Sequence, residues 1–189
     1  MKTLSTASGS TLRTCLICVI CVISAACANP GRPLSPMIIA AREGNVARIT
    51  ELAAAHEDVD QRGGVNDWTP LMHAIHKNQA GSVKALLEAH ADVGVISGTQ
   101  DALTMAAGYG YANIVQMLLD AGAKPSGATL SAAVGGSTDI DRPTVGTCQT
   151  ETVRAILTAA PSLRTRVDAV SLRVAKIAGC KDLVAMLEN

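Results

Sequence analysis

"TPLMHAIHKN", residues 69–78, and "DALTMAAGYG", residues 101–110, place apolar residues at the same positions although few of their letters agree. One constant offset carries Leu71 to Leu103 and Ala74 to Ala106. The same offset relates three further apolar pairs, which are Val83 and Val115, Leu86 and Leu118, and Ala91 and Ala123. An offset that holds at five apolar positions indicates an internal repeat of about 33 residues.

The repeat extends in both directions along the chain. Upstream, Ile49 and Val83 are separated by one repeat, and downstream Val115 and Val184 are separated by slightly more than two, so a unit between them contains an insertion. The insertion is "GGSTDIDRPTVGTCQTE", residues 135–151, between the helix-like segments "LSAAV" and "VRAILTAAP". Its Gly, Pro, Thr and Asp content is typical of a loop, so we predict a loop insertion in the fourth unit.

Each unit is predicted to contain two short helices. In "AAGYGYANIVQMLLDAGA", residues 106–123, the first helix ends near Gly110 and the second runs from about residue 113 to residue 121. Gly122 supplies the left-handed residue that ends the second helix. His56 and His90 occupy the same position in earlier units, which a histidine tolerates, so we interpret them as structural. Helices this short need stacked neighbours to be stable.

This pattern resembles the ankyrin-repeat family over residues 37–189. Thr69, Pro70, Leu71 and Ala74 match the first half of the family pattern, and the second half is matched by Ile114, Val115, Leu118, Leu119, Gly122 and Ala123. The resemblance implies an all-α solenoid of about five helix–turn–helix units, whose first and last units act as caps. Met72 stands where the family usually has His, and Asp101–Ala102 replaces Thr–Pro, so we expect these units to lose a stabilising hydrogen bond.

Residues 1–28 are predicted to form a signal peptide. Lys2 and Arg13 precede the apolar stretch "CLICVICVISAA", residues 15–26, and no acidic residue occurs before Glu43. This stretch is shorter than the roughly 20 residues that span a bilayer. Two ends stay open: cleavage after Ala28, or a lipoprotein signal in which Cys27 is lipidated and becomes the first residue. An uncleaved membrane anchor is a third alternative.

The chain after the predicted signal peptide divides into a tether and a repeat domain. "NPGRPLSP", residues 29–36, is predicted to be an extended tether, and residues 37–189 form the repeat domain. The signal is bacterial in style. It predicts export to the periplasm, with the lipidated form anchored to the outer membrane.

Charge and motifs argue against several classes of function. The whole chain is neutral, and removal of Lys2 and Arg13 leaves a net charge of −2, so nothing favours nucleic-acid binding. The sequence has no G-x-S-x-G motif and no cysteine beside a histidine, so we expect no enzyme activity. His73 and His76 are spaced to share a metal ion, but no third ligand is evident, and we assign neither metal nor cofactor.

Two cysteines remain after the signal, Cys148 and Cys180. An oxidising compartment favours a disulfide between them, although equivalent positions of neighbouring repeats are too far apart to be bridged directly. We therefore expect the insertion to bring Cys148 across to the last unit. Two independent thiols are the alternative.

The resemblance also implies where a partner binds. Family members bind through the turn tips and the exposed positions of the first helix of each unit. Here these positions are Arg42, Glu43, Asn66, Trp68, His76, Lys77, Gln100 and Tyr109. Two of the three aromatic residues of the chain fall in this set, and aromatic residues are enriched in interface hot spots. The alternative is that Trp68 covers a turn and that Tyr109 packs on Tyr111.

We therefore expect a monomeric, non-enzymatic module or scaffold of the cell envelope that binds another exported protein through its concave face. One alternative is an inhibitor or immunity-type protein that neutralises a secreted enzyme or toxin. Another is a structural envelope element with no saturable partner.

Overall fold

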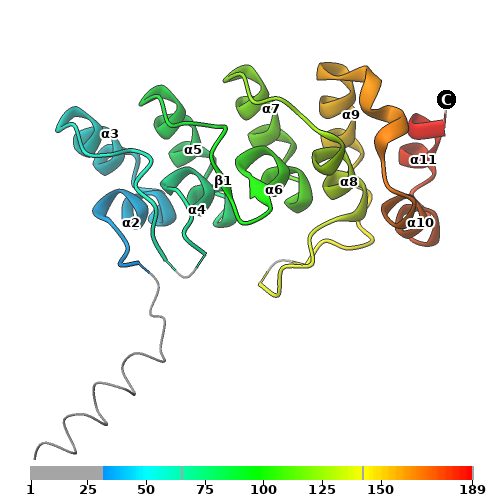
Figure 1. Ribbon diagram of the computed structural model, residues 1–189, viewed down its shortest axis with the longest axis horizontal. Helices are drawn as coiled ribbons and strands as arrows, with labels where there is room; N and C mark the ends of the chain where they lie inside the picture. The colour runs from blue at the N-terminus through cyan, green and yellow to red at the C-terminus, as the bar shows by residue number, and fades with distance from the viewer. Residues whose placement is uncertain (1–31, 65, 142, 189) are drawn as a thin grey trace, which may run out of the picture.

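The computed structural model describes residues 32–64, 66–141 and 143–188. The predicted signal peptide (residues 1–28), Cys27 and the start of the tether lie outside the described residues. The described chain forms five helix–turn–helix units in one row, which confirms the predicted all-α repeat solenoid (Figure 1). In these residues, none of the helices has the length and apolar character needed to cross a bilayer.

The two helices of each unit lie in separate rows, which Figure 1 shows one above the other. The first helices, called inner helices here, are α2 (Pro36–Glu43), α4 (Pro70–His76), α6 (Ala102–Tyr109), α8 (Gly127–Gly135) and α10 (Ala169–Ile177). The second, outer helices are α3 (Val46–Ala54), α5 (Ala80–Glu88), α7 (Ala112–Asp120), α9 (Thr150–Ala159) and α11 (Lys181–Glu188). A 3₁₀ helix, η1 (Pro161–Arg166), follows α9.

Every inner helix begins at a residue whose side chain caps it. Thr69 accepts a hydrogen bond from the amide of Met72 at 3.3 Å, and Asp101 accepts one from the amide of Thr104 at 2.6 Å. The hydrogen bond that we expected the third unit to lose is therefore present, because a carboxylate replaces the threonine hydroxyl and also suits the positive end of the helix dipole. The caps of the other inner helices are Ser35, Ser126 and Asp168.

The repeated apolar positions form one continuous core along the row. Leu71, Leu103 and Leu130 of successive inner helices are almost completely buried, as are Val83 and Val115 of the outer helices. Each inner helix packs against its own outer helix and against the neighbouring inner helices. The constant offset in the sequence therefore reports stacked units, because residues at equivalent positions meet across each interface.

The outer helices of the first three units end as predicted. His56, His90 and Gly122 have φ values of 61°, 63° and 92°, which place all three in the left-handed region. The interpretation of both histidines as structural helix ends is confirmed at the level of the backbone.

The connections from outer to inner helices form two long fingers. Finger 1 is residues 55–69, and finger 2 is residues 89–101, whose tip carries the two-stranded hairpin of β1 (Ile96–Ser97) and β2 (Gln100–Asp101). The Arg62 guanidinium donates to the Ile96 carbonyl at 3.1 Å, and the Ser97 hydroxyl donates to the Asn66 carbonyl at 2.7 Å. These contacts hold the fingers side by side.

The described part of the predicted tether is attached to the first units. Arg32 forms an antiparallel bridge with Gly64 of finger 1, and buried Ser35 caps α2. Residues 32–36 therefore do not extend freely from the domain, because the Arg32 carbonyl accepts a hydrogen bond from the Gly64 amide and Ser35 caps α2.

The inserted loop, defined here as residues 136–149, leaves the end of α8 and runs back along the end of α6 (yellow in Figure 1). The Thr144 hydroxyl and the Gln149 amide both donate to the Gly108 carbonyl, at 2.6 and 3.0 Å. At its end Cys148 is bonded to Cys180, with Cα atoms 5.2 Å apart. The insertion thus brings Cys148 within bonding reach of the last unit.

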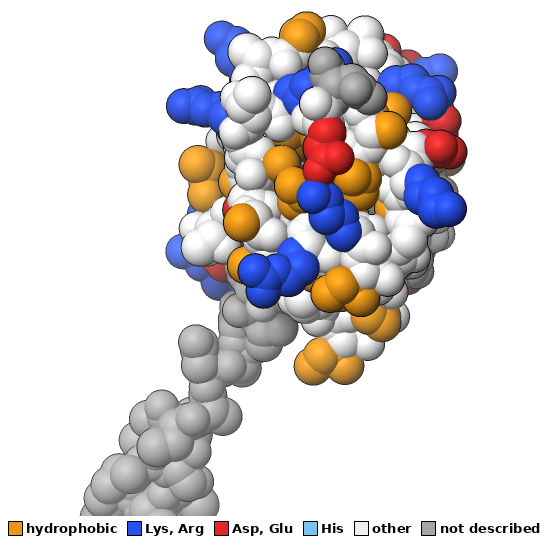
Figure 2. Space-filling view, turned by 90° about the vertical axis from the view of Figure 1, so that its right-hand side faces the viewer, with side chains coloured by type: hydrophobic (Ala, Val, Ile, Leu, Met, Phe, Trp, Pro, Cys, Tyr) orange, Lys and Arg blue, Asp and Glu red, His pale blue; other side chains and the backbone are white. Residues whose placement is uncertain are grey.

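The end of the row formed by the last unit exposes apolar side chains between charged ones (Figure 2). Val170 and Ile177 of α10 are strongly exposed, and the Lys176 ammonium lies 2.7 Å from a Glu188 carboxylate oxygen. No further helix pair covers this end in the part of the chain that the structure describes.

Candidate functional site

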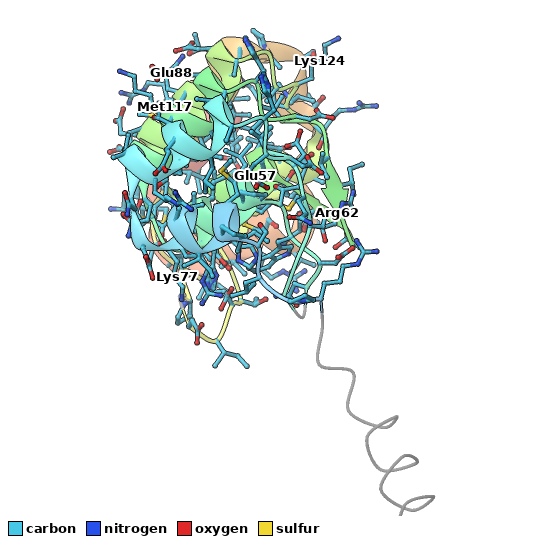
Figure 3. All side chains as sticks on the ribbon, turned by 90° about the vertical axis from the view of Figure 1, so that its left-hand side faces the viewer. Glu57, Arg62, Lys77, Glu88, Met117 and Lys124 are labelled. Carbon is cyan, nitrogen blue, oxygen red and sulfur yellow. A yellow bond between two sulfur atoms is a disulfide. The ribbon has the colours of Figure 1, made fainter. Side chains whose placement is uncertain are left out.

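A cavity of about 530 Å³ lies on the inner-helix face, the face that the family resemblance implies for partner binding. Its floor comes from α4, α6 and α8, one wall from the finger tips, and the other wall from the inserted loop. Figure 3, which views the row end on, shows Arg62 of finger 1 at one edge and the yellow loop projecting below Lys77 at the other. The insertion therefore converts an open face into a walled groove.

Trp68 links the finger wall to the floor. Its ring is half-buried and packs against the rings of His73 and His76, with centroids 5.5 and 5.3 Å away. His73 Nε2 lies 3.2 Å from the Gly63 carbonyl oxygen. Burial is the main cause that lowers the pKa of His73, and the hydrogen bond to Gly63 opposes it. His73 thus supports finger 1 and, unlike His76, does not line the cavity.

The structure corrects the predicted exposure of His76 and Tyr109. Only 8% of His76 and 7% of Tyr109 is exposed. The cause is the inserted loop, since the Tyr109 hydroxyl donates to Asp139 Oδ2 at 2.6 Å and His76 Nε2 lies 3.7 Å from Asp141 Oδ2. Tyr109 also packs on Tyr111, with ring centroids 5.4 Å apart, as in the alternative interpretation.

The predicted binding residues divide between two hollows. Five of them line the cavity, namely Asn66, Trp68, His76, Gln100 and Tyr109. The other three, Arg42, Glu43 and Lys77, line a separate hollow of about 380 Å³ beside Leu34 and Ile39. The positions implied by the resemblance thus do not form one continuous site. The inserted loop spans the third unit and reaches the second, so it forms a wall of the cavity but not of the other hollow.

Sequence reasoning missed the residues of the inserted loop. Asp139, Ile140 and Asp141 line the cavity, and Ile140 is 96% exposed. The length of the insertion and its "TDID" stretch were the available signals. Neither signal indicates in which direction the loop folds, so only the structure shows that both carboxylates face α4 and α6.

The arrangement combines recognition groups of two kinds. Trp68 and Ile140 offer apolar surface, whereas the exposed amides of Asn66 and Gln100 offer hydrogen bonds at the rim. His76, Asp139 and Asp141 are the described residues that could together hold a metal ion. The cavity is therefore equipped for non-covalent binding of a polar ligand with an apolar part.

Comparison with known proteins agrees with this architecture. The family profile described as ankyrin repeats in three copies matches residues 14–97 and 37–129. The human and bovine proteins named ankyrin repeat and SOCS box protein 3 are 34% and 32% identical over 96 residues. That stretch is 49% of this chain but 18% of either relative, so the match spans less than a fifth of their length.

A solved structure has the same fold. The crystal structure of the human ASB11 ankyrin repeat domain superposes with a TM-score of 0.65 at 23% identity, covering 82% of this chain and 68% of that one. Stacked pairs of capped helices, left-handed helix ends and finger connections thus occur together with a matching sequence profile over more than half of the chain. This chain belongs to the ankyrin-repeat family.

Proposed function

We propose that this protein is a non-enzymatic module of the cell envelope that holds a segment of another exported protein in the cavity of its inner-helix face. Ankyrin-repeat domains generally act as protein–protein interaction modules. The observation that carries the proposal is the groove itself, whose finger wall and inserted-loop wall enclose about 530 Å³. A groove with two walls favours binding of an extended segment of a partner over binding of a flat partner surface.

The lining suggests the chemistry of that segment. Trp68 and Ile140 favour an apolar anchor side chain, because contacts with aromatic and apolar side chains dominate binding energy at interfaces. Asp139 and Asp141 place two carboxylates beside this pocket and favour a hydrogen-bond donor or a cation. An extended segment with an apolar residue next to a basic or amide residue fits both features.

Export is the second part of the proposal. The proposal rests on the charged and then apolar pattern of the amino-terminal sequence, which predicts a signal peptide, and on the Cys148–Cys180 bond, which an oxidising compartment favours. Mass spectrometry of the protein recovered from membrane and soluble fractions tests this. A lipidated Cys27 at the amino terminus supports the lipoprotein route, cleavage after Ala28 supports soluble export, and an intact Met1 terminus contradicts both.

Site-specific crosslinking tests partner binding. A photoreactive amino acid at Gln100, which is exposed at the rim of the cavity, should link one predominant protein in envelope extracts. The same group at Lys84, exposed on outer helix α5, is the matched control and should not link it. Asn66→Arg, which obstructs the cavity mouth without touching the core, should abolish the link from Gln100. Equal labelling from Gln100 and Lys84 contradicts the proposal.

The same experiment addresses the alternative function. If the linked protein is an enzyme or toxin that loses activity in the complex, the module acts as an inhibitor or immunity-type protein. If its activity is unchanged, the module acts as a scaffold. The enclosed groove suits either role, since both need a saturable and specific site.

A further inference from the structure

Three potential metal ligands from distant parts of the sequence meet at the edge of the cavity. They are His76 at the end of α4 and Asp139 and Asp141 of the inserted loop. One ligand atom from each lies within 4.8 Å of the other two, and His76 Nε2 is 3.7 Å from Asp141 Oδ2. In the described part of the chain this is the one such group of three.

The surroundings hold two of these side chains in place. The His76 ring packs between the rings of Trp68 and Tyr109, with centroids 5.3 and 5.9 Å away. Asp139 accepts hydrogen bonds from the Tyr109 hydroxyl at 2.6 Å and from the Asp141 amide at 2.8 Å. Neighbours that fix ligand orientation in this way are characteristic of metal sites.

We propose that His76, Asp139 and Asp141 bind a divalent transition-metal ion such as Zn²⁺. In a tetrahedral zinc site, ligand atoms about 2.0–2.1 Å from the metal lie about 3.3 Å from each other, which is close to the observed 3.7 Å. One imidazole with two carboxylates suits zinc and similar ions, whereas calcium and magnesium favour oxygen ligands alone. A divalent cation would also offset the repulsion between the two adjacent carboxylates.

The ion would connect parts of the fold that the repeats alone do not connect. His76 belongs to the second unit, and the two aspartates belong to the insertion of the fourth. Bound metal would therefore fasten the loop across the third unit and fix the width of the groove. All three ligands line the cavity, so any remaining coordination position would be open to water or to a bound segment. This inference does not depend on the proposed partner.

Zinc titration of the purified full chain tests the site. We expect the wild type to bind one Zn²⁺ at this site. The double variant Asp139→Asn/Asp141→Asn should lose this ion, and Asp141→Asn alone should lower the zinc affinity at least about 10-fold. Asp141 is exposed, so its replacement leaves the core intact. Asp120→Asn, an exposed aspartate of α7, is the matched control and should bind as the wild type does. Tyr109→Phe should weaken binding without changing the stoichiometry, because it acts through Asp139.

A second readout separates this site from other metal-binding groups. Cys15, Cys18, Cys21 and Cys27 could also bind Zn²⁺ in the full chain. Co²⁺ bound at the proposed site should give visible absorption without the strong near-ultraviolet bands of cobalt–thiolate bonds. Zn²⁺ should also slow hydrogen exchange in residues 136–141 of the wild type but not of Asp141→Asn. Equal zinc affinity of the wild type and the double variant, or a purely thiolate cobalt spectrum, would overturn the proposal.

Discussion

Asp168 shows how a single side chain begins a helix. Its carboxylate accepts hydrogen bonds from the Ser171 hydroxyl at 2.6 Å and from the amides of Ser171 and Val170 at 2.8 and 3.0 Å. These bonds, led by the one from the Ser171 hydroxyl, lower the pKa of Asp168 to about 2. They satisfy donors that the first turn of α10 would otherwise leave without a partner.

Loss of this cap should destabilise the last unit. We expect Asp168→Ala to lower the free energy of unfolding by about 1 kcal/mol at pH 7, and Asp168→Asn to lose much less. Because the pKa is lower in the folded state, the ionised cap contributes fully above pH 4. Its contribution is lost as the pH falls toward 2. Urea unfolding of both variants at pH 7 and pH 2.5 measures this, with Asp120→Ala as the control.

His73 should make stability depend on pH in a higher range than Asp168 does. Burial lowers the pKa of His73 below 6.5, so between that folded-state pKa and pH 6.5 the unfolded chain binds more protons than the folded one. Stability should therefore fall as the pH drops from 7.5 to 5, and His73→Gln should reduce this fall. Urea midpoints with a chelator present measure it, and exposed His90→Asn is the control. An unchanged pH dependence in His73→Gln would contradict the assignment.

At the scale of the element, the outer helices of the first three units each end in a left-handed residue, where the chain turns toward the next inner helix. His90 and Gly122 serve this purpose in neighbouring units, with φ values of 63° and 92°. A Cβ at Gly122 would have no atom within 4 Å, so any cost of adding one comes from the backbone alone. The same left-handed position is thus occupied by a glycine in one unit and by a histidine in the other, and glycine adopts the left-handed conformation more readily.

Exchanging these residues should change stability in opposite directions. We expect His90→Gly to raise the free energy of unfolding by about 0.5–1 kcal/mol, and Gly122→Ala to lower it by about 1 kcal/mol. Thermal and urea unfolding measure both. A loss in both variants would mean that the His90 side chain makes contacts that outweigh its backbone strain.

At the scale of the whole molecule, the row of units is stabilised mainly by contacts between neighbours. The disulfide adds a covalent connection, since it ties the insertion of the fourth unit to Cys180 just before α11. The last unit exposes apolar residues at its outer end and packs on one side only. It therefore depends more on this bond than the central units do.

Removing the bond should loosen one end of the row. The bonded residues are 32 apart, so Cys148→Ser/Cys180→Ser should lower the free energy of unfolding by about 3–4 kcal/mol. Hydrogen exchange should accelerate in α10 and α11 and stay unchanged in α4 and α5, because solenoid units communicate only with their neighbours. Uniform acceleration along the chain would show that the units unfold as one.

Sequence alone determined the repeat, its five units and most helix ends. The reason is that apolar spacing, caps such as Thr69 and left-handed ends such as His90 act within a few residues or recur at a fixed period. Only the tertiary structure decided the path of the inserted loop. That path buries His76 and Tyr109 and brings Asp141 beside His76. The loop has no period and no repeat counterpart, so its contacts follow from where the folded chain places it and not from any pattern in its letters.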